Sequence, residues 1–214
     1  MNPQRFEGQF ITLTTLDVAA DVAELFAISH GDEKTCNLWR YMPRGPFANA
    51  EEYAAFLHEW QATPNVVVFI VRDAASARIL GTISLMSIRA DHRVAELGWI
   101  WYAPAAQRTK ANTEACYLLL RHCFETLHYR RMEWKCDARN APSRAAALRL
   151  GFTFEGIFRQ HMIIKGENRD TAWFAMLDNE WPQIASSFRH WLYEDGSIPL
   201  GRLIAESRSV QSGA

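Results

Sequence analysis

The sequence predicts an α/β (α+β) fold with about seven strands and helices between them. Two observations lead to this class. Runs of apolar and β-branched residues alternate with amphipathic segments in the order β, α, α, β, β, β, α, β, α, β, β, α. The chain has 214 residues, 49% of them hydrophobic, without a composition shift or an internal repeat. One sizeable core fits this length, so we expect a single domain over residues 1–214.

Alternating or continuous apolar runs predict the strands. They are expected at residues 9–16, 65–73, 79–89, 93–103, 130–137, 152–164 and 170–177. The run "NVVVFIVRD" is nearly continuous, as is typical of a strand buried on both faces, and "DAASAR" after it predicts a hairpin. In the run "RVAELGWIWYA", alternation places Glu96 and Ile100 on one face and Trp99 and Trp101 on the other.

N-cap residues and a helical spacing of apolar residues predict the helices. They are expected at residues 17–30, 49–62, 112–127, 140–151 and 180–193. Asp17, Asn49 and Asn140 stand at the N-cap positions of three of them. The third helix has one apolar stripe, formed by Cys116, Leu119, Leu120, Cys123, Phe124 and Leu127. This stripe predicts a helix with one face on the core.

The folded core is expected over about residues 8–182. The C-terminal helix, about 180–193, is followed by a polar tail, about 205–214, which is polar enough to be disordered. Exposed tryptophans on that helix, Trp181 and Trp191, would suit a homodimer.

Composition argues against several classes of partner. The 23 lysines and arginines nearly balance the 24 aspartates and glutamates, so no overall field would draw the chain to nucleic acid or to an anionic membrane. The N-terminal residues lack the apolar run of a signal peptide, and no run approaches the roughly 18–20 apolar residues that span a bilayer. We therefore expect a cytoplasmic protein without nucleic-acid or membrane partners.

The cysteines and histidines do not have metal-site spacing. The four cysteines contain no C-x-x-C pair, and His122 and His128 do not share a helix face at i, i+4. No metal site is expected.

A polar turn precedes the third helix, and its residue types suit an anion. Residues 107–113 follow a strand and open a helix, where backbone N–H groups and the positive end of the helix dipole face outward. Arg108 and Lys110 add positive charge there. Neither G-x-x-x-x-G-K-[ST] nor G-x-G-x-x-G occurs, so a P-loop or a Rossmann dinucleotide site has no local support. A solvated helix cap with ordinary surface charges explains the same residues equally well.

Three longer segments carry a resemblance to a known family. "ELGWIWYAPAAQRTKANTEACYLLL", "ARNAPSRAAALRLGFTFEG" and "FRQHMIIKGENRDTAWFAML" resemble successive motifs of the GNAT superfamily of N-acetyltransferases, and are most similar to its RimJ/RimL-like branch. The resemblance covers roughly residues 8–182. It implies a GNAT-type central sheet that is mixed, mostly antiparallel and twisted, and that splays between its fourth and fifth strands, with helices on both faces. It also implies acetyl-CoA as acyl donor and a primary amine as acceptor, either a protein N-terminus or a small molecule.

The resemblance also implies where acetyl-CoA binds. Gln107 matches the first position of the family's diphosphate loop, whereas Lys110 and Asn112 stand where the family usually has small residues. Here the side chain of Lys110 must either point away from the diphosphate or bind it. The backbone of the preceding strand, near Ile100, would pair with the pantetheine amides. The residues expected to contact acetyl-CoA are Ile100, Trp101, Tyr102, Gln107, Arg108, Thr109, Lys110, Ala111, Asn112, Thr113, Asn140 and Ser143.

Catalytic residues are expected from the same comparison. Glu96 is the candidate base, although it can equally be an exposed strand acid or form a salt bridge to Arg93. Ser143 is the candidate acid because the tyrosine that many relatives use is missing from "AAALRLGF"; a water molecule is an equal rival, and capping a helix is the alternative role for Asn140 and Ser143. His161 is a second base candidate with a structural alternative.

The acceptor site is expected to include Trp39, Tyr41, Glu96 and His161. Direct attack of the amine is expected because no Cys-His or Ser-His-Asp spacing suggests an acyl-enzyme. The alternative function is an acyl-CoA sensor or interaction module, in which the substitutions at Lys110 and Asn112 have weakened turnover.

Overall fold

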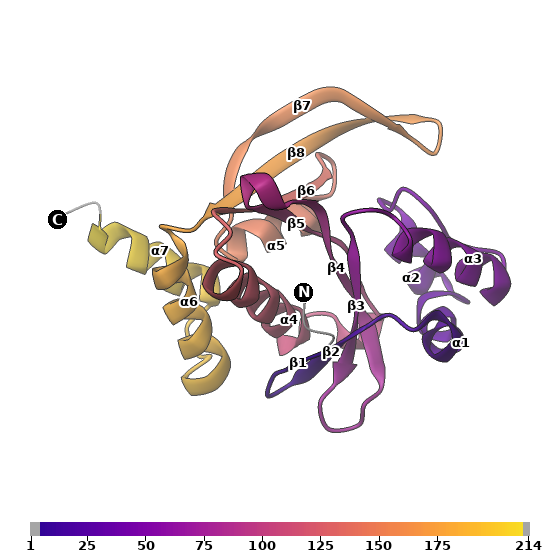
Figure 1. Ribbon diagram of the computed structural model, residues 1–214, viewed down its shortest axis with the longest axis horizontal. Helices are drawn as coiled ribbons and strands as arrows, with labels where there is room; N and C mark the ends of the chain where they lie inside the picture. Colours follow the sequence, from indigo (N-terminus) through magenta and orange to yellow (C-terminus); the bar gives the residue numbers. More distant parts are fainter. Residues whose placement is uncertain (1–4, 212–214) are drawn as a thin grey trace. The chain divides into compact units, whose positions relative to one another are not determined.

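The computed structural model describes residues 5–211, which form an eight-stranded, mostly antiparallel open sheet and helices (Figure 1). The chain divides into two compact units. The first comprises residues 1–88 and 97–118, and the second comprises residues 89–96 and 119–214. This arrangement confirms the predicted mixed α/β class, with one strand more than expected.

The first unit contains the N-terminal strands and the first three helices. Its elements are β1 (Arg5–Glu7), β2 (Ile11–Thr15), α1 (Val18–Ser29), α2 (Glu33–Cys36), α3 (Ala50–Gln61), β3 (Val67–Asp73), β4 (Ile79–Arg89) up to residue 88, β5 (Val94–Tyr102) from residue 97, and α4 (Lys110–Arg121) up to residue 118. Strands β1 to β5 are neighbours in chain order. Sequence analysis missed β1 and α2, both of which are short.

Two predicted caps of this unit are confirmed. The Asp17 side chain accepts from the backbone N–H of Ala20, and the Asn49 side chain accepts from that of Glu52 at 2.8 Å. Each bond satisfies one of the backbone donors that a helix start leaves without a helical partner. Helices α1 and α3 pack on strands β3 to β5 through an apolar cluster that includes Leu25, Tyr53, Leu57, Ile70 and Trp101.

The second unit contains the C-terminal half of the sheet. Its elements are β6 (Arg131–Asp137), α5 (Ala141–Arg149), β7 (Thr153–Ile164), β8 (Glu167–Leu177), α6 (Trp181–Arg189) and α7 (Leu200–Gln211). The strand order is β5-β6-β8-β7, in which β5 and β6 are parallel and the other pairs are antiparallel. The described register joins residues 94–96 of β5 to residues 131–133 of β6. The short parallel pairing lies at the pair of strands where the splay was expected.

Several helix predictions need correction. Residues 113–120 of α4 are all buried, so this helix is enclosed on all sides rather than on one stripe. Helix α7 occupies residues 206–211 of the expected disordered tail, and residues 212–214 lie outside the described part. Trp181 is 3% exposed, and its indole N–H donates to Glu125 at 2.8 Å, so it is not a surface tryptophan.

Strand β5 does not keep the strict alternation expected for it. Trp99 has a φ of 51°, in the left-handed region, which breaks the extended geometry on which a period of two depends. Trp99 and Trp101 both pack on the cluster beneath α1 and α3, as expected. Because the period of two is broken between Glu96 and Ile100, the prediction that these two residues share a face of the sheet no longer follows.

Candidate active site

The turn before α4 is shaped by its own hydrogen bonds. The Gln107 side chain donates through Nε2 to the carbonyl of Tyr102 at 3.1 Å. The Thr109 hydroxyl donates to the carbonyl of Ala106 at 2.7 Å and accepts from the backbone N–H of Ala111 at 3.3 Å. Thr109 therefore acts as an N-cap, because it accepts from the second residue of the helix. Residues 107–109 are exposed, so the start of α4 faces solvent.

Arg108 supplies the left-handed backbone in this turn. Its φ is 61°, a region that favours glycine. The expected departure from the family pattern concerned Lys110 and Asn112, but both lie inside the first turn of α4. The ammonium of Lys110 lies 4.6 Å from the centroid of the Phe10 ring, a cation–π contact. Of the two cations at this turn, Arg108 is therefore the more exposed to solvent.

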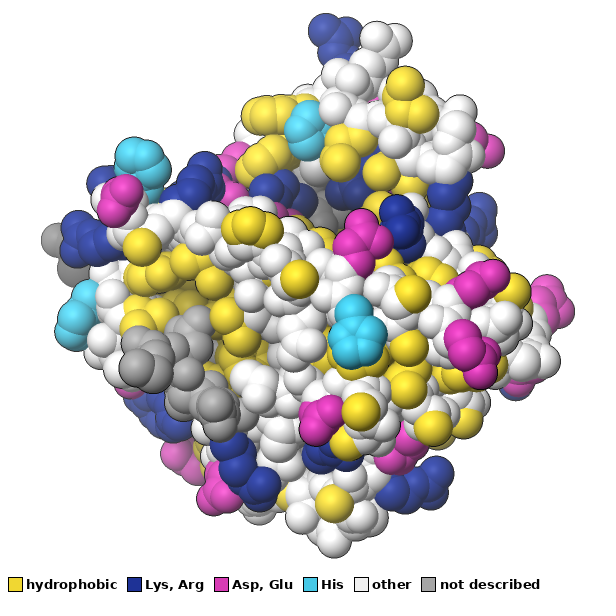
Figure 2. Space-filling model, turned by 45° about the vertical axis from the view of Figure 1, so that its right-hand side comes forward, with side chains coloured by type: hydrophobic (Ala, Val, Ile, Leu, Met, Phe, Trp, Pro, Cys, Tyr) yellow, Lys and Arg dark blue, Asp and Glu magenta, His cyan; other side chains and the backbone are white. Residues whose placement is uncertain are grey.

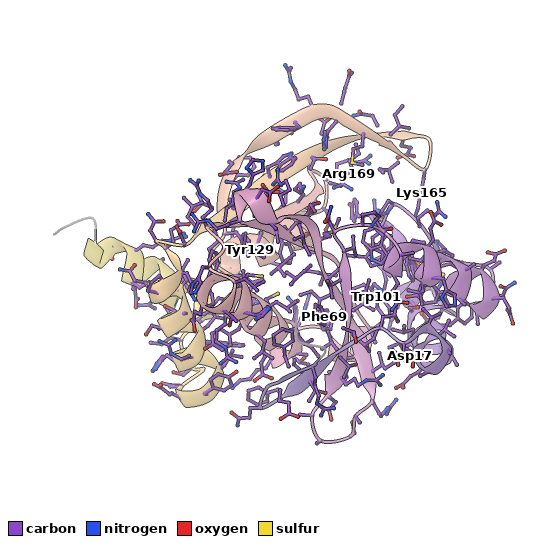
Figure 3. All side chains as sticks on the ribbon, viewed as in Figure 1. Asp17, Phe69, Trp101, Tyr129, Lys165 and Arg169 are labelled. Atoms are coloured by element: carbon purple, nitrogen blue, oxygen red, sulfur yellow. The ribbon has the colours of Figure 1, made fainter. Side chains whose placement is uncertain are left out.

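Near the end of β5, the backbone groups of alternate residues point away from β4. The backbone N–H of Ala103 donates to the carbonyl of Leu80 on β4 at 2.8 Å. Because backbone groups of successive residues in a strand point to opposite edges, those of Ile100 and Tyr102 point away from β4. The carbonyl of Tyr102 accepts the glutamine bond described above, which agrees with this direction. Trp101, labelled in Figure 3, has its side chain in the core and is 4% exposed.

Tyr102 itself does not have the properties of a catalytic acid. Burial raises its pKa well above the ordinary range, and within the described residues its hydroxyl is a buried group without a hydrogen-bond partner. Its contribution to a site therefore comes from its backbone.

A buried carboxylate ties the N-terminal strand to α4, and sequence analysis missed it. Glu114 is fully buried, and its carboxylate accepts from the backbone N–H groups of Gln9, Phe10 and Ile11 at 2.8, 2.7 and 2.8 Å. A Cβ atom at Gly8 would lie 2.4 Å from the Glu114 carboxyl carbon, so the chain needs glycine there. The residues next to Glu114 in the sequence do not indicate this contact, because its partners lie on another element.

The two expected acceptor-site aromatics of the first unit differ in exposure. Trp39 is 1% exposed, and its indole N–H donates to the carbonyl of Ser29 at 2.9 Å, so its side chain is a core residue. Tyr41 is half-buried, and the Arg40 guanidinium lies 5.3 Å from its ring centroid. Tyr41 is thus the one of the pair that reaches the surface.

In the second unit, Glu96 is a buried acid with a cationic partner. Glu96 is 5% exposed, and its Oε2 lies 2.7 Å from Nζ of Lys135 on β6. A salt bridge was one of the expected alternatives, but the partner expected there was Arg93. The structure places Lys135 in that position instead.

Asn140 and Ser143 open helix α5. Asn140 is the N-cap, since its side chain accepts from the backbone N–H of Ser143 at 3.1 Å. The Ser143 hydroxyl oxygen accepts from the indole N–H of Trp134 at 3.0 Å. Burial raises the pKa of the neighbouring Cys136 thiol, which the Ser143 side chain also contacts. The expected helix-cap role of Asn140 is therefore present, and Ser143 is anchored to β6.

His161 lies on a wide bulge of the β7–β8 hairpin. The register shifts between Phe158 and Met162, and a left-handed φ of 51° at Gln160 re-aims the following side chain. His161 is exposed, and its Nδ1 lies 2.9 Å from the hydroxyl of Thr171. Its ring is 6.0 Å from that of Trp173, centroid to centroid. This bond links His161 on β7 to Thr171 on β8.

The hairpin also exposes apolar surface. Figure 2 shows hydrophobic side chains in the upper part of the view, where Figure 1 places β7 and β8. Large exposed hydrophobic residues of β7 are Phe154, Ile157, Phe158, Met162 and Ile163. Arg169, labelled in Figure 3 on β8, has a buried Nε without a described hydrogen-bond partner.

The expected site residues thus form two groups, each within one unit. Ile100 to Tyr102, the turn at 107–109 and the start of α4 meet in the first unit. Glu96, Asn140, Ser143 and His161 belong to the second. Among residues 5–211, no cluster of three histidine, cysteine, aspartate or glutamate side chains could hold a metal ion. Over the same residues, no helix has both the length and the apolar character to cross a membrane.

Comparison with known proteins agrees with this geometry. Residues 11–153 match the family model described as "Acetyltransferase (GNAT) domain". The crystal structure of a GCN5-related N-acetyltransferase from Brucella melitensis is 37% identical, covering 95% of this chain and 96% of its own, with a TM-score of 0.89. That of a probable GNAT-family acetyltransferase from Chromobacterium violaceum ATCC 12472 is 39% identical, covering 85% and 90%, with a TM-score of 0.80.

A curated relative of Bacillus subtilis (strain 168) is named "Putative ribosomal N-acetyltransferase YdaF". It is 32% identical over 103 residues, which are 48% of this chain and 56% of that protein, so the alignment spans about half of the relative. Its name agrees with the RimJ/RimL-like branch indicated by the motifs. The family match and the Brucella structure show that this chain is a member of the GNAT family and an N-acetyltransferase.

Proposed function

We propose that this chain transfers an acetyl group from acetyl-CoA to a primary amine by direct attack within a ternary complex. The observation that carries the proposal is the exposed, capped start of α4, where Arg108 holds a left-handed turn. A helix start offers backbone N–H donors and a positive dipole end to an anion. The diphosphate of acetyl-CoA is an anion of the required kind.

The donor would be held by backbone groups and by the cations of this turn. The N–H groups of residues 107–113 would surround the diphosphate once those of Gln107 and Ala111 leave Pro104 and Thr109, and Arg108 would add a charge-assisted bond. Lys110 would have to leave the Phe10 ring to reach a phosphate. The outward edge of β5 at Ile100 offers one N–H and one carbonyl to the pantetheine amides, in the manner of an added strand. Asn140 and Ser143 would contact the pantetheine arm near the thioester.

Acetyl-CoA supplies an activated thioester, and the chain's residues move the protons. The acceptor amine must be neutral to attack. An α-amine with a pKa near 8 is about one-tenth neutral at pH 7, whereas a lysine starts roughly 4.6 kcal/mol uphill. Glu96 would take the proton from the amine. The Ser143 oxygen accepts from the indole N–H of Trp134, and its hydroxyl would leave its contact with Cys136 to donate to the departing thiolate. Tyr41 and His161 would border the acceptor.

The first experiment is isothermal titration with acetyl-CoA and with desulfo-CoA, followed by a thiol-release screen against amines. We expect micromolar binding of both ligands and release with at least one amine class. The screen should include ribosomal-protein N-terminal peptides, because the B. subtilis relative is named for a ribosomal activity. Binding without release would favour the acyl-CoA sensor. No binding at millimolar concentration would refute the proposal.

Variants separate the two cations of the turn. Arg108→Gly keeps the left-handed backbone and removes the charge, whereas Lys110→Ala removes the other charge. Loss of one charge-assisted bond should weaken acetyl-CoA binding by about 10- to 100-fold at low salt. Arg78→Ala, on the exposed β3–β4 turn, is the matched control. If either variant binds acetyl-CoA like the control at low and high salt, that side chain does not bind the diphosphate.

A further inference from the structure

The ammonium of Lys135 lies in a pocket of charge and aromatic surface inside the second unit. Its Nζ is 2.7 Å from Oε2 of Glu96 and 3.6 Å from Oε2 of Glu133. The same Nζ lies 4.2 Å from the ring centroid of Trp173 on β8. The two carboxylates are 5% and 4% exposed. The Lys135 side chain therefore has contacts on three sides.

The register of the strands explains why the three charged groups meet. Glu96 and Glu133 are direct partners on the parallel strands β5 and β6, so their carboxylates lie side by side. Lys135 follows Glu133 by two residues and so points to the same face of the sheet. Two adjacent carboxylates repel, and the ammonium between them removes the repulsion. Without Lys135, two buried like charges would face each other.

Other cations hold Glu133. Arg89 and Arg131 both contact Oε1 of Glu133, at 2.8 and 3.0 Å. Oε2 of Glu133 is buried without a hydrogen-bond partner in the described residues and faces the ammonium at 3.6 Å. The shorter contact of Lys135 is thus with Glu96. The negative charge of Glu133 attracts the Lys135 ammonium and limits the positions that Nζ can take.

We propose that Lys135 is a positioning residue for Glu96: its ammonium holds the Glu96 carboxylate ionised and in one orientation on β5. This inference rests on the proposed function, in which Glu96 takes the proton from the acceptor amine.

The proposal fixes the direction of a pH effect. The reaction requires ionised Glu96, and a neighbouring ammonium favours that form, so the rate reaches its plateau at a lower pH when Lys135 is present. Removing the ammonium also exposes Glu96 to the charge of Glu133, which acts in the same direction. Arg89 and Arg131 remain on Glu133 and reduce that second effect. The acidic limb of the rate profile should therefore move to higher pH by about 1 to 3 pH units.

The test compares rate–pH profiles of thiol release for the wild type, Lys135→Met and Lys135→Arg with a saturating, weakly basic amine that stays neutral over the pH range, so that protonation of the acceptor does not itself set the acidic limb. Methionine keeps the length and the apolar stem but lacks the charge, and arginine restores the charge. Lys34→Met, on the exposed helix α2, is the control for loss of one lysine. We expect the acidic limb to shift in Lys135→Met, to return toward wild type in Lys135→Arg, and to stay in place in Lys34→Met.

The outcomes separate the inference from the proposed function. An active Lys135→Met enzyme whose profile superimposes on the wild type overturns the inference and leaves the function standing. The inference is also overturned, and the function left standing, if the acidic limb of Lys135→Arg shifts as far as that of Lys135→Met. A wild type that releases no thiol with any amine overturns both. If Lys135→Met does not fold, Lys135→Gln takes its place, because it is uncharged and retains a polar contact to Glu96.

Discussion

Replacing Glu114 should show how much of the fold depends on one buried carboxylate. Glu114 accepts three backbone hydrogen bonds, from Gln9, Phe10 and Ile11, at 2.7–2.8 Å. Hydrogen bonds to a charged group contribute about 1.5–3 kcal/mol each. The amides of Gln9 and Phe10 are partly exposed and can regain water, so we take the lower bound for each bond. Glu114→Ala should then lower the free energy of unfolding by about 4.5 kcal/mol.

A second variant keeps the shape of the side chain. Glu114→Gln retains one acceptor oxygen, which can serve Phe10 and Ile11, but directs its NH₂ group at the N–H of Gln9. We expect a loss of about 2 kcal/mol, between the loss of one bond and the loss of three. This variant remains informative if the alanine variant does not fold.

The assay is urea unfolding followed by tryptophan fluorescence. The free energies of unfolding are compared with the same slope against urea concentration for every variant. Glu206→Ala is the control, because Glu206 is exposed and pairs with Arg202 across one helical turn at 2.8 Å. Such a pair contributes about 0.3–0.5 kcal/mol. A loss below about 1 kcal/mol in Glu114→Ala would refute the argument that these bonds tie the N-terminal strand to α4.

Three further predictions test other parts of the structure. Gly81→Ala should destabilise the protein by about 1–3 kcal/mol in urea, because the added Cβ would lie 2.1 Å from a backbone carbonyl oxygen of β5; an unchanged midpoint would contradict this. Burial lowers the pKa of His30, whose Nε2 accepts from the backbone N–H of Phe47, so the unfolded state binds more protons and stability should fall as the pH drops below about 6.5. His30→Gln should remove that slope, and thermal unfolding from pH 8 to 5 measures it. Cys36 is exposed, whereas burial raises the pKa of Cys123 to about 12 and the other two thiols are buried, so a disulfide reagent should titrate one thiol quickly in the native protein and four after unfolding.

Much of the fold could be predicted because its signals are local. Asp17, Asn49 and Asn140 cap helices as expected, since an N-cap bond joins residues three apart in the chain. The positions of the strands were likewise predicted from local runs of apolar residues. The two short elements β1 and α2 escaped because a few residues do not establish a period.

The candidate site was predictable in outline but not in its contacts. The turn before α4 was located from its residue types, yet the left-handed residue is Arg108 rather than one of the residues that replace the family's small ones. Backbone conformation at that point depends on the bonds of Thr109 and on the preceding 3₁₀ turn, Pro104–Ala106, which a residue pattern does not specify.

The sequence by itself determined the order of the longer elements up to residue 193, the helix caps and the family to which the chain belongs. Tertiary structure alone decided that Lys135 rather than Arg93 pairs with Glu96, that Trp39 lies in the core, and that Glu114 binds the N-terminal strand. The physical reason is distance along the chain. Capping and periodicity act between near neighbours, whereas Glu114 and Phe10 are 104 residues apart, and such partners meet only when the strands and helices pack.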